Sequence, residues 1–265
     1  MAKLRRDEHR KTTRLDMHVH TRGSDGWGSP EEIVARAIER GLDGLVICDH
    51  HHTVTKGGSE VITLGRRRGL IMLHGCEYNT RQGHCLVYGV DVDQLALGRY
   101  PEMQMVIDAV WAAGGVACPS HPYYGYREML GDGIYRLQGL VAAEKVNGQN
   151  EIRCPRSNER AEEAIRALGI QAIGGSDAHN PEQVGLAFTE FAGRVTTERE
   201  LVRALRGGRY RARRNHRSLE GMRISRAQVL PRMYLIINFK GTVPEKQLAV
   251  RTRLLSGGHW TNPSI

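Results

Sequence analysis

The chain has 265 residues, of which 40% are hydrophobic and 6% aromatic, and it carries a formal net charge of +9 at pH 7. This length suits one large α/β domain or two small ones, and no run approaches the ~20 apolar residues that span a bilayer, which argues against a membrane protein. The basic N-terminus lacks the apolar segment of a signal peptide, so we expect a cytoplasmic protein whose positive charge either draws phosphate esters and nucleic acid or serves solubility.

Seven short runs have the composition of buried or half-buried strands: residues 14–20, 43–48, 70–77, 84–90, 115–120, 139–146 and 170–175. The first helix is expected from Pro30 to Gly41, because Ser29 and Glu32 form a capping box around its start. Further helices are expected over 101–113, 158–168 and 197–206. This alternation predicts a mostly parallel α/β domain that closes, or nearly closes, into a barrel.

The pattern loosens after residue 207, which divides the chain into an expected barrel over 14–207 and a basic appendage over 208–265. The appendage either stands apart or completes the barrel domain, and residues 233–239 read as one more strand. Its arginine-rich run at 206–217 would either follow a nucleic-acid backbone or form an exposed edge strand, and the second interpretation is favoured because no aromatic platform accompanies it.

The five cysteines offer no CxxC pair, and four of them lie in apolar runs, so we expect buried, reduced thiols. The chemistry must therefore come from other residues. In the first expected strand, His18 and His20 alternate with Met17 and Val19, so the two imidazoles would share a face at the carboxyl end of the strand, where active sites of parallel α/β folds lie.

Histidines and carboxylates recur near the ends of nearly every other expected strand. The full set of candidate ligands is His18, His20, Asp25, His50, Glu77, His84, His121, Asp177 and His179. Gathering so many ionisable groups in one cleft is costly unless cations are held there. Imidazole and carboxylate together suit zinc, manganese or iron, and nine ligands exceed the needs of one ion. The set predicts two or three divalent metals that share a bridging carboxylate.

Five motifs occur in an order that resembles the PHP (polymerase and histidinol phosphatase) superfamily: the opening DMHVHTRGSDG…CDHH, then GCEYNTRQGH, CPSHP, EKVNG and GGSDAHNPEQVG. The resemblance covers roughly residues 14–195. It implies a distorted (β/α)7 barrel of the TIM-like PHP type with a di- or trinuclear metal centre. The activity it implies is metal-dependent hydrolysis of phosphate esters of a small phosphorylated metabolite or nucleotide.

The resemblance also assigns the ligands. Glu77 would bridge two metals, one held also by His18, His20 and Asp177 and the other by His84 and His121. A third metal would be held by Asp25, His50 and His179. A metal-bridging hydroxide would attack phosphorus in line, which gives Glu77, Asp177, His50 and His179 catalytic roles, with His50 or His179 as the general acid.

Substrate contacts are predicted at Arg22, Arg81 and Arg127, which lie just beyond ligand-bearing strand ends where a phosphate clamp would form. Most arginines are simply solvated, so a surface position is the alternative for each. Asn147 of the EKVNG motif would also reach the substrate. Tyr123 and Tyr124 would either stack on a base or pack in their loop, and packing is favoured.

Three other functions stay open at this point: a phosphodiesterase or exonuclease acting on short oligonucleotides, a non-catalytic module that binds nucleic acid or a partner, and a metal-dependent amidohydrolase. The intact ligand set disfavours the binding module. Only 36 residues separate His84 from His121, a region where relatives acting on nucleoside bisphosphates or short RNA often carry an inserted subdomain, which disfavours that substrate class. The sequence leaves the oligomeric state open.

Overall fold

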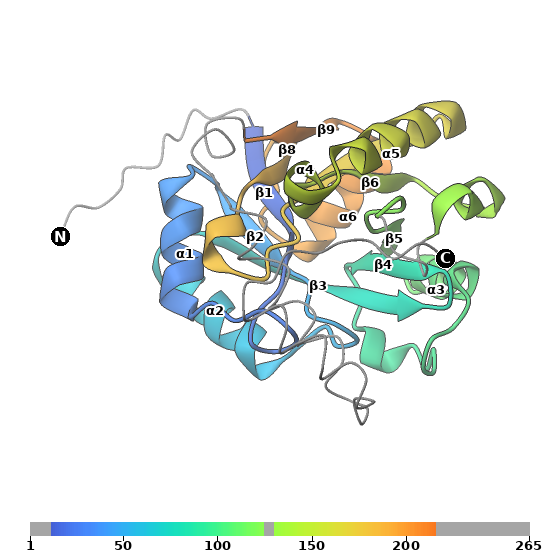
Figure 1. The fold of residues 1–265 in the computed structure, drawn as a ribbon. Coiled ribbons are helices and arrows are strands. Elements are labelled where there is room, and N and C mark those ends of the chain that lie inside the picture. Colours follow the sequence, from blue (N-terminus) through green and yellow to red (C-terminus); the bar gives the residue numbers. More distant parts are fainter. Residues whose placement is uncertain (1–11, 125–129, 216–265) are drawn as a thin grey trace, which may run out of the picture. The chain divides into compact units, whose positions relative to one another are not determined.

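The computed structural model describes residues 12–124 and 130–215, so the expected strand at 233–239 and the candidate Arg127 lie outside the described residues. The described part is an α/β fold whose main sheet curls strongly (Figure 1). Within it, no helix is both long and apolar enough to cross a membrane. Four of the five cysteines are buried, Cys154 is half-buried, and all five are free thiols.

The main sheet has seven strands in the order β5-β4-β3-β2-β1-β8-β9. Their bounds are β1 Thr12–Val19, β2 Gly44–Ile47, β3 Ile71–Thr80, β4 Gly83–Tyr88, β5 Val116–Pro119, β8 Ala187–Ala192 and β9 Tyr210–Arg214. A second sheet pairs β6 (Ala142–Asn147) with β7 (Gln171–Gly175). Only β1–β2, β2–β3 and β6–β7 are parallel, while the other four pairings are antiparallel, so the expectation of a mostly parallel domain is wrong.

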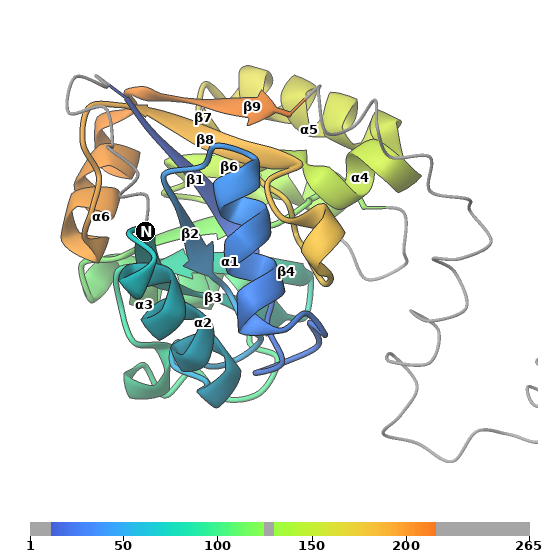
Figure 2. The same cartoon turned by 90° about the vertical axis from the view of Figure 1, so that its left-hand side faces the viewer.

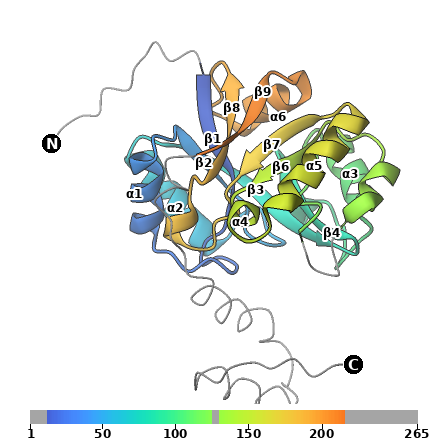
Figure 3. The same ribbon diagram turned by 45° about the horizontal axis from the view of Figure 1, so that its top comes forward.

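Six α-helices surround the strands: α1 Pro30–Glu39, α2 Lys56–Arg67, α3 Met103–Ala112, α4 Gly148–Arg153, α5 Pro155–Leu168 and α6 Glu198–Gly207. Short 3-10 turns lie at Val92–Gln94, Gly131–Arg136 and Pro181–Gln183. The predicted capping box of α1 is present, with Ser29 accepting from the Glu32 backbone and Glu32 accepting from the Ser29 backbone. Helices α1 and α2 lie side by side along the sheet (Figure 2), and α5 lies along β6 and β7 (Figure 3).

One apolar cluster draws a residue from every described strand and is closed by Leu201 and Leu205 of α6. Leu15 and Met17 of β1 belong to it, whereas Val19 belongs to a second cluster with Ile33 of α1 and residues of α2. The pairing of β1 with β2 shifts register between Asp16 and Val19, which explains why the three residues do not share one face as strict alternation predicts. The shift occurs where β1 enters the site.

The beginning of the expected appendage is β9, the edge strand of the main sheet, which pairs with β8. This confirms the edge-strand interpretation of the arginine-rich run for residues 210–214. Two of its arginines form ion pairs: Arg213 with Glu190 at 2.9 Å and Arg214 with Glu151 at 2.6 Å. The charged side chains therefore lie on an edge strand, where they oppose the pairing of this strand with a strand of another chain.

Candidate metal centre

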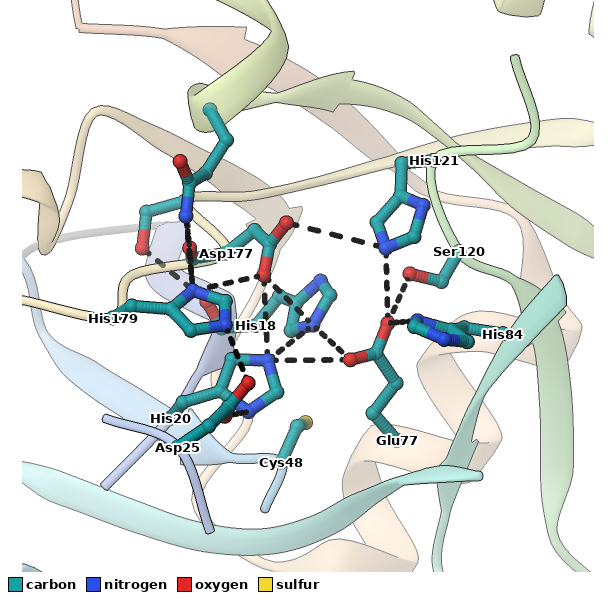
Figure 4. Close-up of polar contacts among 12 residues, drawn as sticks. His18, His20, Asp25, Cys48, Glu77, His84, Ser120, His121, Asp177 and His179 are labelled. Carbon is teal, nitrogen blue, oxygen red and sulfur yellow. Dashed lines mark hydrogen bonds and ion pairs between the residues drawn. The ribbon is translucent and has the colours of Figure 1, made fainter. Parts of the chain in front are cut away.

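The nine predicted ligands, far apart in the chain, meet at one end of the strands, and Figure 4 labels all of them except His50. His18 and His20 come from the end of β1, His50 follows β2, Glu77 lies in β3, His84 in β4, and His121 follows β5. Asp177 and His179 follow β7, and Asp25 lies in the loop after β1. The structure therefore brings together all nine side chains.

The innermost group consists of His18, His20, Glu77 and Asp177, all of them buried. The Nε2 atoms of the two imidazoles lie 3.0 Å apart. Glu77 Oε2 lies 3.4 Å from His18 Nε2 and 3.3 Å from His20 Nε2, and Asp177 Oδ1 lies 3.5 and 3.3 Å from the same two nitrogens. Two ring nitrogens and two carboxylate oxygens thus point at one small volume.

The second oxygen of Glu77 faces a different group. Glu77 Oε1 lies 3.2 Å from His84 Nδ1 and 3.1 Å from His121 Nε2, and it accepts a hydrogen bond of 2.6 Å from Ser120 Oγ. Because its two oxygens serve separate clusters, Glu77 has the geometry of a bridging carboxylate.

The third group is more exposed and centres on Asp25. Asp25 Oδ2 lies 3.0 Å from His179 Nε2 and 3.4 Å from His50 Nε2, while Asp25 Oδ1 lies 3.3 Å from His20 Nδ1. His50 also lies 3.5 Å from Glu77 Oε2, so it stands between the Asp25 group and the bridging carboxylate. The side chains of Asp25, His50 and His179 are 18–25% exposed and that of His84 is 28% exposed, so solvent reaches the centre from these residues.

Glu144 supports the inner group from behind and was missed by the sequence reasoning. It is fully buried in β6; Oε1 lies 3.0 Å from His18 Nδ1, and Oε2 accepts from the His121 backbone N–H and the Asn147 amide at 2.9 Å each. A carboxylate on Nδ1 fixes the proton there and leaves the Nε2 lone pair facing the centre. The available signal was a glutamate after two alanines in an expected strand, AAEKV.

Asp49 organises the loop that carries Asp25. Its carboxylate accepts from the Thr21 backbone at 2.7 Å, the Thr21 hydroxyl at 2.6 Å, the Ser24 hydroxyl at 2.9 Å and the Thr55 hydroxyl. Thr55 is also the N-cap of α2. The loop is therefore tied to a helix start through one buried carboxylate.

Asp16, which precedes His18 in β1, does not join the nine ligands. It is fully buried, and it accepts from the backbone N–H groups of Ser176 and Gly185 at 2.7 Å each. Burial raises the pKa of Asp16 to about 6, against the lowering effect of these hydrogen bonds. Asp16 holds the segment that presents Asp177 and His179.

The carboxylates and imidazoles of the centre stabilise each other's charged forms. Burial opposes the charged imidazole of His20, yet Asp25, Asp177 and Glu77 raise its pKa to about 10. Although burial opposes their ionisation, the facing imidazoles hold the pKa values of Asp25, Glu77 and Asp177 well below the usual range. His84 differs, because burial lowers its pKa. A cluster of anions therefore attracts positive charge at this spot.

The residues present fit divalent cations. Asp177 Oδ1 is buried without a hydrogen-bond donor, although it faces the convergent imidazole nitrogens of His18 and His20. A metal ion would satisfy this oxygen and the facing lone pairs at once. His121 and Asp177 also adopt positive φ angles of 28° and 54°, and strained backbone of this kind concentrates at functional sites.

The predicted substrate contacts have mixed positions. Arg22 is exposed and donates to the Trp27 carbonyl at 3.2 Å, and Arg81 is exposed beside Glu102 at 3.6 Å. Asn147 is fully buried, and its amide donates to Glu144 and, at 3.2 Å, to Asp177. Tyr123 is buried and donates to Asp132, which agrees with packing in the loop.

Comparison with family models gives two matches: a model described as PHP domain covers residues 16–179, more than half of the chain, and one described as PHP-associated covers residues 155–210. An uncharacterised protein of Methanocaldococcus jannaschii is 28% identical over 135 residues, which are 47% of this chain and 76% of that protein. A 3',5'-nucleoside bisphosphate phosphatase of Chromobacterium violaceum is 31% identical over 117 residues, 39% of this chain and 40% of that protein.

Among solved structures, the fold is similar to that of a two-domain protein from Bacteroides vulgatus that contains a predicted PHP-like metal-dependent phosphoesterase. The TM-score is 0.56 at 20% identity, and the match covers 76% of this chain and 64% of that one. At this identity the likeness concerns the fold.

Proposed function

The chain belongs to the PHP-domain family of metal-dependent phosphoesterases, and on that premise we propose that it hydrolyses phosphate esters of a small phosphorylated metabolite or nucleotide at the nine-residue centre. The observation that carries the proposal is the division of Glu77 between two clusters, with Oε2 toward His18 and His20 and Oε1 toward His84 and His121. This is the arrangement that two adjacent cations require.

The inner cation would be held by His18, His20, Glu77 and Asp177, and the second by Glu77, His84 and His121. Asp25 and His179, with His20 or His50, would hold a third. Manganese, zinc and iron all suit this donor set. When bound, such ions lower the pKa of coordinated water toward neutrality and neutralise charge on the phosphoryl oxygens.

The chain's own residues position the reactants. Glu144 orients His18, Ser120 orients Glu77, and Asn147 links Glu144 to Asp177, so the inner group is rigid before substrate arrives. His50 and His179 lie on the exposed side, where either can protonate the leaving oxygen. Arg22 and Arg81 remain candidates for the phosphate, whereas we assign Asn147 to positioning because its amide is already engaged.

The fold we propose in finer detail is the distorted (β/α)7 barrel, spanning residues 14–207. In it the β6–β7 pair would fill the gap between β5 and β1. Three contacts support this arrangement. They are the β-bridge between Val19 and Ala178, the hydrogen bond from the His121 backbone N–H to Glu144, and the apolar cluster to which every described strand contributes. A cytoplasmic location remains a prediction.

The test is Glu77→Gln in the full chain, with elemental analysis and a phosphate-release screen over sugar phosphates, nucleotides and dinucleotides in the presence of manganese. Removing the bridging charge should lower both metal content and turnover, the latter by about 10²–10³-fold. The matched control is Glu162→Gln, which affects only the ion pairs of Glu162 with Lys145 and Arg166, away from the nine ligands. Normal metal content and turnover in Glu77→Gln would contradict the proposal. Cleavage of dinucleotides to nucleoside and nucleotide, without release of inorganic phosphate from the monoesters, would favour a phosphodiesterase.

A further inference from the structure

A second charged hollow lies at the opposite end of β1 from the metal centre. It is a cavity of about 200 Å³ between α6 and the segment joining β8 to α6, lined among others by Arg194, Arg203 and Arg209. Its lining residue Ala192 pairs with Thr12 at the start of β1, whereas His18 and His20 lie at the end of that strand. The separation along the strand is roughly 20 Å. Figure 2 shows α6 next to the start of β9.

The three arginines have uncompensated charge. Within residues 12–124 and 130–215, none of their guanidinium groups lies within ion-pair distance of a carboxylate. The carboxylate in the lining, Glu200, is already used, because it accepts from both the backbone N–H and the hydroxyl of Thr196 at 2.8 Å each. Three guanidinium groups and one carboxylate therefore line the hollow, which keeps a net positive charge.

Neighbouring arginines behave differently. Arg206 donates to the Gly115 carbonyl at 2.9 Å and stacks on Trp111 at 4.0 Å, and Arg213 is paired with Glu190. The arginines that line the cavity thus differ from Arg206 and Arg213, whose guanidinium groups have partners within the described residues. The hollow itself exists because small residues line it: Ala204 and Gly207 of α6 leave the space open, and a Cβ added at Gly207 would meet no atom within 4 Å.

We propose that this cavity binds a phosphate group, at a site separate from the metal centre. Guanidinium groups bind phosphate oxygens through paired N–H donors, and three of them around one space match a tetrahedral dianion in charge and in donor number. The phosphate belongs either to a small phosphorylated compound or to a nucleic-acid backbone. The site holds its ligand without contact to the nine metal-centre residues, so it is independent of the proposed hydrolysis.

The test titrates inorganic phosphate into the full, manganese-loaded chain by calorimetry. The triple variant Arg194→Gln, Arg203→Gln, Arg209→Gln should weaken one binding event at least tenfold. Gly207→Leu should weaken the same event without changing any charge, because it fills the space on a helix that tolerates leucine. The control variant Arg67→Gln, Arg68→Gln, Arg156→Gln removes the same charge from exposed positions elsewhere and should bind as the wild type does.

Metal content and turnover of the two cavity variants should equal those of the wild type, which separates this site from the catalytic one. Unchanged phosphate binding in both cavity variants, or an equal loss in the control variant, overturns the proposal. Comparing glycerol phosphate with a ten-nucleotide single strand then assigns the source. If the strand binds at least tenfold more tightly and weakens steeply with salt, the phosphate is that of a nucleic acid; otherwise it belongs to a small compound.

Discussion

At the scale of single residues, Glu144 shows how one carboxylate can define a metal site without touching the metal. Its two oxygens have separate tasks: Oε1 faces His18 Nδ1, while Oε2 accepts from the His121 backbone and from Asn147. All three partners are donors toward Glu144 when the His18 proton is on Nδ1. Two ligands, at the ends of β1 and β5, and the positioning residue Asn147 thus depend on one buried anion for their orientation.

Glu144→Gln should therefore weaken metal binding by about 10–100-fold. Glutamine has one acceptor oxygen where glutamate has two, and its NH₂ group is a donor. Either His18 or the pair of His121 N–H and Asn147 therefore meets a donor where it needs an acceptor. At least one buried polar group then loses its hydrogen-bond partner. Metal affinity measured by competition with a chelator tests this. Glu162→Gln is the control for the same chemical change, and equal affinities in the two variants would contradict the assigned role.

The titration of the centre gives a second prediction, for the metal-free chain. An imidazole whose pKa is raised on folding stabilises the folded state, and this stabilisation is complete below its ordinary pKa of 6.5. It is lost as the pH rises through the pKa in the folded state, which is about 10 for His20. The pKa values of His18, His50 and His121 are also raised, since their facing carboxylates outweigh burial. The melting temperature of chelator-treated protein should therefore fall between pH 6.5 and pH 10.

On the acid side the sign reverses. The lowered pKa values of Asp25, Glu77 and Asp177 add stability above their ordinary values of 3.8–4.5, and this stability is lost as pH falls below that range. Metal-loaded protein serves as the control, because cations replace the imidazole protons and should flatten the alkaline decline. Metal-free stability that stays constant or rises between pH 6.5 and 10 would refute this account.

The ligands were predictable from sequence, whereas their supports were not. His18, His20 and His121 stand at strand ends, and imidazoles in such places have few purposes other than chemistry. A buried carboxylate such as Glu144 or Asp49 acquires its role only from donors that folding brings to it from other elements. Its own sequence neighbours do not reveal those donors, so spacing along the chain carried no signal.

At the scale of elements, α2 links a helix cap to the metal centre. The Thr55 hydroxyl donates to Asp49 and accepts from the Gly58 backbone at 2.9 Å, so it closes the start of α2 and helps to fix the loop that carries Asp25. Thr197 caps α6 in the same way, accepting from the Glu200 backbone, but lies at the far end of the strands. The two caps form a matched pair for experiment.

Thr55→Ala and Thr197→Ala should each lower the free energy of unfolding by about 1 kcal/mol, because each removes an N-cap acceptor. Only Thr55→Ala should also reduce the metal content, through the loosened loop around Asp25. Urea unfolding and elemental analysis of both variants measure the two effects. Thr55→Ser keeps the hydroxyl and should therefore bind metal as the wild type does. If Thr197→Ala loses as much metal as Thr55→Ala, the loss follows from lower overall stability and not from the loop around Asp25.

The elements that sequence reasoning missed share weak local patterns. Helix α2 was not expected because Gly57, Gly58 and Gly65 lower its helix propensity, yet glycine is needed there: a Cβ at Gly57 would meet the Gly23 backbone nitrogen at 2.3 Å. Strand β8 was also missed, and its antiparallel pairing with β1 and β9 is one of the reasons why the sheet is mixed. Strand existence follows from composition, but strand direction depends on contacts between distant segments.

At the scale of the whole described structure, the two ends of the strands have opposite electrostatic character. At one end, the carboxylates of Asp25, Glu77 and Asp177 gather around imidazoles, and at the other, Arg194, Arg203 and Arg209 surround a cavity. Between them lies the apolar cluster to which every strand contributes. Only the folded chain brings these carboxylates and imidazoles together, so a cation that binds them would favour the folded state.

Cation binding should therefore stabilise the fold as a whole. A ligand that binds only the folded state adds about 2.7 kcal/mol when present at 100 times its dissociation constant. For a domain of this size, 1 kcal/mol corresponds to roughly 2–4 °C in melting temperature, so each such cation should add about 5–10 °C. Scanning calorimetry before and after chelation measures the shift. Glu77→Gln, which lacks the bridging charge, should lose most of this response, and an equal chelator effect in wild type and variant would place the stabilising cations elsewhere.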